Sequence, residues 1–123
     1  MFINLSNHPS EKWDEKQRKA AEEYGNIMDI KFPAVESHGD ERYILDLAKE
    51  FVESIMEYAN EELAVMVQGE FTLTFAIVSE LKERGIRVVS ACSERNVHNE
   101  VNSEGEEVKV TRFEFVRFRE YVQ

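Results

Sequence analysis

Short apolar runs alternate with amphipathic helical segments, and this alternation limits most strongly the folds open to the chain. The runs are predicted as strands over residues 2–6, 27–32, 63–67 and 86–92. Ser10 is predicted to cap a first helix that stops at Gly25, Asp40 precedes a second helix, and residues 71–84 form a third. Repeated strand-helix-strand units favour right-handed crossovers and parallel strands.

The expected fold is therefore α/β: a three-layer Rossmann-like sandwich with a mainly parallel sheet in the order 2-1-3-4. After the last of these strands, residues 97–101 and 108–118 flank a turn at residues 103–106 and predict a C-terminal β-hairpin. A chain of 123 residues is expected to form one domain over residues 1–123.

Charge and composition exclude several classes of function. The formal net charge of −10 argues against a surface that binds long nucleic acid, because such surfaces gather many Lys and Arg side chains. No apolar stretch reaches membrane length, and Cys92 has no second cysteine with which to form an internal disulfide. We therefore expect a cytoplasmic protein without membrane contact. The spacing of His and Cys matches no metal site, so neither a metal nor another cofactor is expected.

The candidate site lies where strands are predicted to end. In an open parallel sheet a ligand binds outside the carboxyl ends of the strands, where successive crossovers leave to opposite faces. In the order 2-1-3-4 this point lies between the first and third strands. It is predicted to bring together three groups of residues: Ser6, Asn7 and His8; Gln68, Gly69, Glu70 and Thr72; and Ser93, Glu94 and Arg95.

Each residue type suits a small phosphate-bearing ligand. Gly69 is expected to adopt a backbone conformation that other residues avoid and to let a ligand approach closely, and Thr72 lies in the first turn of the following helix. His8 can transfer a proton near neutral pH, and Arg95 can hold a phosphate through two donors. The structural alternatives are a turn glycine, a helix cap, a loop-fixing histidine and a solvated arginine.

The strand ending in Ser6-Asn7-His8-Pro9, together with the tips Gln68-Gly69-Glu70-Phe71-Thr72 and Ala91-Cys92-Ser93-Glu94-Arg95, resembles small CRISPR-associated Rossmann-like proteins. These proteins are related to CARF domains and to stand-alone ring nucleases of antiviral defence. The resemblance implies a homodimer that binds a cyclic oligoadenylate, or another small nucleotide, across both subunits. It also implies metal-independent cleavage, in which a ribose 2′-hydroxyl attacks the adjacent phosphate.

On this resemblance, Asn7, His8 and Arg95 are the expected catalytic residues. The expected ligand-binding residues are Ser6, Gln68, Gly69, Thr72 and Ser93. Three alternatives stay open: a sensor that binds the same ligand without cutting it, a nucleoside or nucleotide glycosidic-bond enzyme with Glu70 as nucleophile, and a dimeric interaction protein. In the last case an exposed aromatic hairpin is the interface, with Phe113, Phe115, Phe118 and Tyr121 on it.

Overall fold

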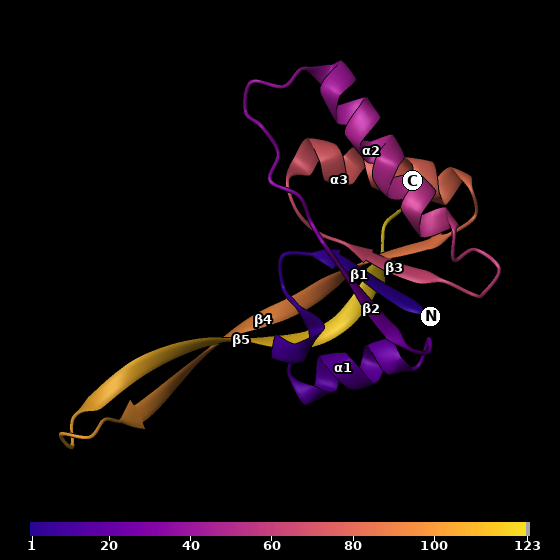
Figure 1. The fold of residues 1–123 in the computed structure, drawn as a ribbon. Coiled ribbons are helices and arrows are strands. Elements are labelled where there is room, and N and C mark those ends of the chain that lie inside the picture. Colours follow the sequence, from indigo (N-terminus) through magenta and orange to yellow (C-terminus); the bar gives the residue numbers. More distant parts are fainter. Residues whose placement is uncertain (123) are drawn as a thin grey trace.

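The computed structural model describes residues 1–122 and has a five-stranded mixed sheet in the order β2-β1-β3-β4-β5 (Figure 1). Neighbouring strands among β1 to β4 are parallel, and β5 runs antiparallel to β4. The strands are β1 (Phe2–Ser6), β2 (Ile27–Lys31), β3 (Ala64–Val67), β4 (Arg87–Val101) and β5 (Glu107–Glu120). The helices are the single 3₁₀ turn η1 (Ser10–Lys12), then α1 (Glu15–Glu22), α2 (Glu41–Met56) and α3 (Phe71–Glu83). The expected α/β class is confirmed.

Helices cover both faces of the sheet. Figure 1 shows α1 on one face and α2 with α3 on the other. Successive side chains of a strand point to opposite faces, so Ile3 and Val65 join the core under α2 and α3, whereas Phe2 and Met66 join the core beside α1. Both faces of the central strands are therefore buried, as in parallel sheets covered by helices.

The first helix begins later than Ser10, so that expected cap is wrong. Ser10 opens η1, and its hydroxyl donates to Asp29 Oδ2 over 3.1 Å instead of capping a helix. Asp14 is the cap of α1, since its carboxylate accepts a hydrogen bond from the backbone N–H of Gln17 at 2.8 Å. Asp40 precedes α2, as expected, and its carboxylate caps this helix by accepting from the N–H of Tyr43 at 3.0 Å.

The fourth strand does not stop at Cys92. β4 continues to Val101 because β5 pairs with it from Val89 to Val101, with one register shift between Cys92 and Ser93. At this β-bulge Val116 is the extra residue, since Arg117 pairs with Cys92 and Phe115 pairs with Ser93. Beyond the bulge the hairpin extends away from the helices as a two-stranded ribbon (Figure 1). Residues 93–117 of this ribbon are called the arm below.

Within residues 1–122, none of the helices combines the length and apolar character that crossing a bilayer requires.

Candidate functional site

The carboxyl ends of β1 and β3 lie side by side. Leu5 pairs with Val67, and the backbone N–H of Gln68 donates to the carbonyl of Leu5 at 3.1 Å. The helix that follows β1 lies on one face and the helix that follows β3 on the other (Figure 1). The loops that follow these two strands thus start at adjacent positions on one edge of the sheet, with Ser6, Asn7 and His8 beside Gln68, Gly69 and Glu70.

A buried polar network fixes the loop after β1. Asn4 is 1% exposed, and its amide nitrogen donates to the carbonyl of His8 at 2.8 Å and to Asp29 Oδ1 at 3.0 Å. The Ser6 hydroxyl donates to Asn4 Oδ1 at 2.7 Å and accepts from the N–H of His8 at 3.1 Å. The Ser6 hydroxyl is therefore used within the protein, and its role is to shape the loop.

The sequence interpretation missed Asn4 and Asp29. The available signal was a polar residue in the middle of the apolar run Phe2-Ile3-Asn4-Leu5, because a buried amide requires partners. Asp29 also accepts from the backbone N–H of Ser10 at 3.1 Å, so it joins β2 to the loop that follows β1.

Asn7 and His8 are the first residues of this loop, and their side chains are exposed with no hydrogen bond to any other part of residues 1–122. The indole N–H of Trp13 donates to the carbonyl of His8 at 3.2 Å, which fixes the backbone beneath the free imidazole. Asn7 also lines a surface pocket of about 440 Å³ with Lys31, Phe32, Pro33 and Ala34. Asn7 and Lys31 thus line one pocket at the carboxyl edge.

Gly69 is required for a different reason from the one expected. Its φ angle is not positive, so the expected unusual backbone conformation is wrong. Instead, a Cβ atom at this position would overlap the aromatic ring of Phe32, which is buried. Glycine here allows the loop after β3 to pack directly on a side chain that follows β2.

The N-terminus of α3 is occupied by a carboxylate of the chain. Glu70 caps the helix: its side chain accepts from the backbone N–H groups of Thr72 and of Leu73, the latter at 3.1 Å, and from the Thr72 hydroxyl at 2.7 Å. The hydroxyl of Thr72, together with the two N–H groups, lowers the pKa of Glu70 below its ordinary value, against a smaller opposing effect of desolvation. A phosphate at this helix end must displace Glu70 first.

Gln68 links the two halves of the edge. Its side-chain oxygen accepts from the backbone N–H of Ala91 at 2.5 Å, which ties the loop after β3 to β4. Its amide nitrogen has no hydrogen-bond acceptor within residues 1–122, so this nitrogen remains able to donate to a ligand.

Ser93, Glu94 and Arg95 do not lie at a strand end as expected. They lie within β4, on the arm, where they pair with Phe115, Glu114 and Phe113. Arg95 lies four residues beyond Ala91, which corresponds to about 13 Å along a strand. The structure thus brings together the residues that follow β1 and β3 and separates Arg95 from them.

Three of the aromatic residues expected on an exposed hairpin face are wholly or partly covered. Phe115 is buried, and Phe118 packs on Phe2 with 4.9 Å between ring centroids. The Tyr121 hydroxyl donates to the carbonyl of Val67 at 2.7 Å, and burial raises the pKa of Tyr121. Phe113 alone of the four is largely exposed, at 73%.

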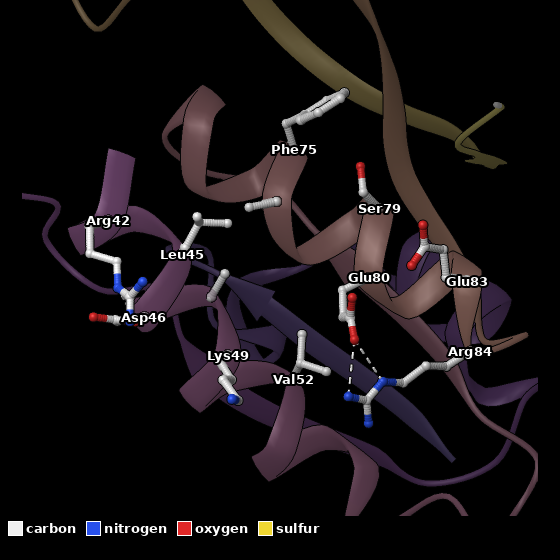
Figure 2. Close-up of a pocket in the computed structure, with 12 residues that line it drawn as sticks. Arg42, Leu45, Asp46, Lys49, Val52, Phe75, Ser79, Glu80, Glu83 and Arg84 are labelled. Carbon is white, nitrogen blue, oxygen red and sulfur yellow. Dashed lines mark hydrogen bonds and ion pairs between the residues drawn. The ribbon is translucent and has the colours of Figure 1, made fainter. Parts of the chain in front are cut away.

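A second pocket, of about 550 Å³, lies between α2 and α3 (Figure 2). Its arginines are already paired with carboxylates: Arg84 contacts Glu80 at 3.0 Å and Arg42 contacts Asp46 at 3.3 Å. Leu45 and Phe75 project beside it, and both are exposed. Its charged groups thus largely neutralise one another, which makes it a poorer anion site than the carboxyl edge.

The fold and this edge define a small α/β protein in which polar loops meet at the end of a mixed sheet. The chain belongs to the family described as "Uncharacterized protein MJ1673 family", whose model matches residues 1–119. No curated protein and no solved structure matches the chain significantly.

Proposed function

We propose that the protein binds a cyclic oligoadenylate at the carboxyl edge of β1 and β3 and cleaves it, as a Rossmann-like, CRISPR-associated protein of the cytoplasm that acts as a homodimer. The observation that carries the proposal is the adjacency of two loops at the edge: the free side chains of Asn7 and His8 follow β1, and the Gln68 amide follows β3, one hydrogen bond from Leu5. In open α/β sheets such a switch point is where ligands bind.

The proposed reaction uses the ligand's own nucleophile. The 2′-oxygen of one ribose attacks the adjacent phosphorus and loses its proton, while the bond from phosphorus to the 5′-oxygen breaks and that oxygen gains a proton. The products are a 2′,3′-cyclic phosphate and a 5′-hydroxyl. His8 moves a proton at one of the two oxygens, and Asn7 donates a hydrogen bond to a phosphate oxygen. No further reactant is needed.

Positive charge comes from two places in this proposal. Lys31 lines the same pocket as Asn7, so it is the cation proposed to contact the scissile phosphate. Arg95 lies on the arm, so it contacts a phosphate on a more distant part of a ring-shaped ligand. Glu70 swings away from the N-terminus of α3 when a phosphate takes its place, which frees the Thr72 hydroxyl for the ligand.

The direct test is incubation of the purified protein with cyclic tri-, tetra- and hexa-adenylate in the presence of a chelator. Linear products with a 2′,3′-cyclic phosphate are expected by chromatography and mass spectrometry. His8→Ala is expected to reduce the rate at least tenfold with binding retained, whereas His38→Ala, another exposed histidine, leaves the rate unchanged. Binding without products would assign a sensor, and no binding of any ring would overturn the proposal.

A second candidate is favoured by the position of Glu70, whose exposed carboxylate lies at the same edge. An ionised carboxylate beside an amide that can hold a ribose suits a nucleophile for glycosidic-bond cleavage. Glu70→Gln would then abolish release of free base from nucleosides and nucleotides, while His8→Ala would not. Ring cleavage that survives in Glu70→Gln excludes this candidate for the cyclic ligand.

A further inference from the structure

The arm leaves the body of the protein as an isolated two-stranded ribbon (Figure 1). From Ser93 to Val101 it spans eight residue steps, or about 27 Å. Two-stranded ribbons are marginally stable in water unless one face packs on something. The two faces of the arm differ in how their side chains are covered.

The first face, here the paired face, is partly covered by ion pairs among its own side chains. It carries Glu94, Asn96, His98, Glu100, Val108, Val110, Arg112 and Glu114. Arg112 contacts Glu100 at 2.8 Å, and His98 Nε2 lies 3.5 Å from Glu114 Oε1. Asn96, Glu100 and Val110 are half-buried as a result. This face needs no external partner.

The opposite face, here the open face, has no such cover. By register and alternation it carries Arg95, Val97, Asn99, Val101, Glu107, Lys109, Thr111 and Phe113. No side chain on it makes a hydrogen bond or ion pair within residues 1–122. Phe113 is 73% exposed, and Val97 and Val101 are exposed as well. Large apolar side chains gathered on one face mark an interaction surface.

The open face is continuous with the aromatic core beside α1. Phe118 packs on Phe2, and Phe115 packs on Phe118 with 4.8 Å between ring centroids. Phe113 is the next residue of this series, two positions from Phe115 on the same side of the ribbon. The apolar surface therefore begins in the core and runs out along the arm into solvent.

Charge indicates what covers this face. Its cations, Arg95 and Lys109, have no carboxylate partner within the described residues, and one acid, Glu107, lies near the tip. Most of the formal net charge of −10 lies outside the arm. A second copy of the chain therefore offers an acidic surface that complements this apolar, cationic face.

We infer that the open face of the arm packs on the body of a second copy of this chain, so that two protomers exchange arms around a two-fold axis. A ribbon about 27 Å long and about 10 Å wide presents roughly 270 Å² of flat face, so one arm on a partner body buries roughly 540 Å² in total, below the roughly 1,000 Å² that a specific interface clears. Two reciprocal arms bury roughly 1,080 Å² in total, and a two-fold axis provides them. The inference rests on the homodimer of the proposed function and names the surface that joins it; it does not depend on ligand cleavage, which incubation with cyclic adenylates tests separately.

The test compares two phenylalanines of nearly equal exposure. Phe113, on the arm, is 73% exposed, and Phe75, on α3, is 75% exposed. The native chain is expected to sediment at twice its mass of 14.4 kDa at tens of micromolar protein. Phe113→Asp is expected to raise the dimer dissociation constant at least a hundredfold, whereas Phe75→Asp leaves it unchanged. Circular dichroism checks the fold of each variant.

Two more variants keep the inference testable if Phe113→Asp fails to fold. Arg95→Glu reverses a charge on the open face and is expected to weaken the dimer at least tenfold, and Arg112→Glu, on the paired face, serves as its control. A native chain that is monomeric at every concentration overturns the inference. So does dissociation by Phe75→Asp with no effect of Phe113→Asp or Arg95→Glu, because that result places the interface on α2 and α3.

Discussion

At the scale of single residues, the roles at the carboxyl edge are decided by contacts with neighbours. Gly69 is a glycine because the ring of Phe32 fills the space of a side chain. Glu70 and Thr72 satisfy each other at the start of α3. Asn7 and His8 have a fixed backbone but side chains without partners in residues 1–122, so both side chains, together with the Gln68 amide nitrogen, can contact a ligand.

Gly69→Ala tests the contact with Phe32. The added methyl group would overlap the ring, so the free energy of unfolding is expected to fall by about 1–3 kcal/mol, measured by urea denaturation. In a Phe32→Leu background the same change is expected to lower the free energy of unfolding by less, because the ring atoms that the methyl group would overlap are absent. Equal losses of unfolding free energy in both backgrounds would show that the contact with Phe32 is not the reason for a glycine at position 69.

Glu70→Gln tests the cap of α3 through pH. The lowered pKa of Glu70 means that the ionised carboxylate stabilises the native state above the ordinary value of 4.5, and that this contribution is lost as pH falls through the lowered pKa. The native chain is therefore expected to be more stable than Glu70→Gln at pH 7, and the difference should shrink below pH 4.5. Thermal melts of both proteins between pH 7 and pH values below 4.5 measure this difference. A difference that does not change with pH would contradict the role of the Glu70 carboxylate as the cap of α3.

At the scale of elements, a buried polar cluster joins β1, β2 and the loop after β1. Asn4 is its centre, and it connects the carbonyl of His8 to Asp29. The hydrogen bonds of this cluster hold the loop in one conformation although the loop is neither helix nor strand. They thereby position the exposed side chains of Asn7 and His8.

Asn4→Leu should be much more harmful than its position in an apolar strand suggests. It leaves the buried Ser6 hydroxyl and one carboxylate oxygen of Asp29 without the Asn4 partner, so a loss of about 1–3 kcal/mol in the free energy of unfolding is expected. Amide exchange at His8 should become faster. Asn7→Ala, an exposed change in the same loop, is the matched control and should alter stability by less than about 0.5 kcal/mol.

The elements also show which parts of the structure were predictable. The strand at Ala64–Val67 was readable because its side chains are apolar on both faces. The end of β4 was not, because pairing with β5, and not the local apolar pattern, extends the strand to Val101. The cap of α1 was misplaced for a similar reason: Ser10 bonds to Asp29, a residue on another strand. The end of β4 and the cap of α1 were mispredicted because both depend on residues that lie far away in the sequence.

At the scale of the whole molecule, the protein consists of a covered sheet and an arm that contributes little to its core. The buried apolar residues lie in residues 2–89, with Phe115 as the exception on β5. Tyr121 follows β5, and its hydroxyl donates to the carbonyl of Val67, so the end of the chain beyond the arm is bound to β3. Folding of the body should therefore not require the distal arm.

Replacement of residues 97–111 by Asn-Gly tests this separation. Asn96 and Arg112 are register partners, so a two-residue turn joins them without strain. The shortened chain is expected to retain its helical circular dichroism. Its free energy of unfolding should lie within about 1 kcal/mol of that of the native chain when both are measured as monomers. Loss of cooperative unfolding would show that the arm belongs to the core.

The bulge at Cys92 and Ser93 has a consequence for how such chains diverge. Because Val116 has no partner of its own on β4, its removal would leave Arg117 opposite Cys92 and Phe115 opposite Ser93, so Phe113 would stay on the same face of the arm. A β-bulge bends and twists the strand that carries it. A single-codon deletion at Val116 in this family can thus change the direction of the arm while its pairing, the helices and the carboxyl edge stay unchanged. Assembly can therefore change at the bulge independently of the ligand site.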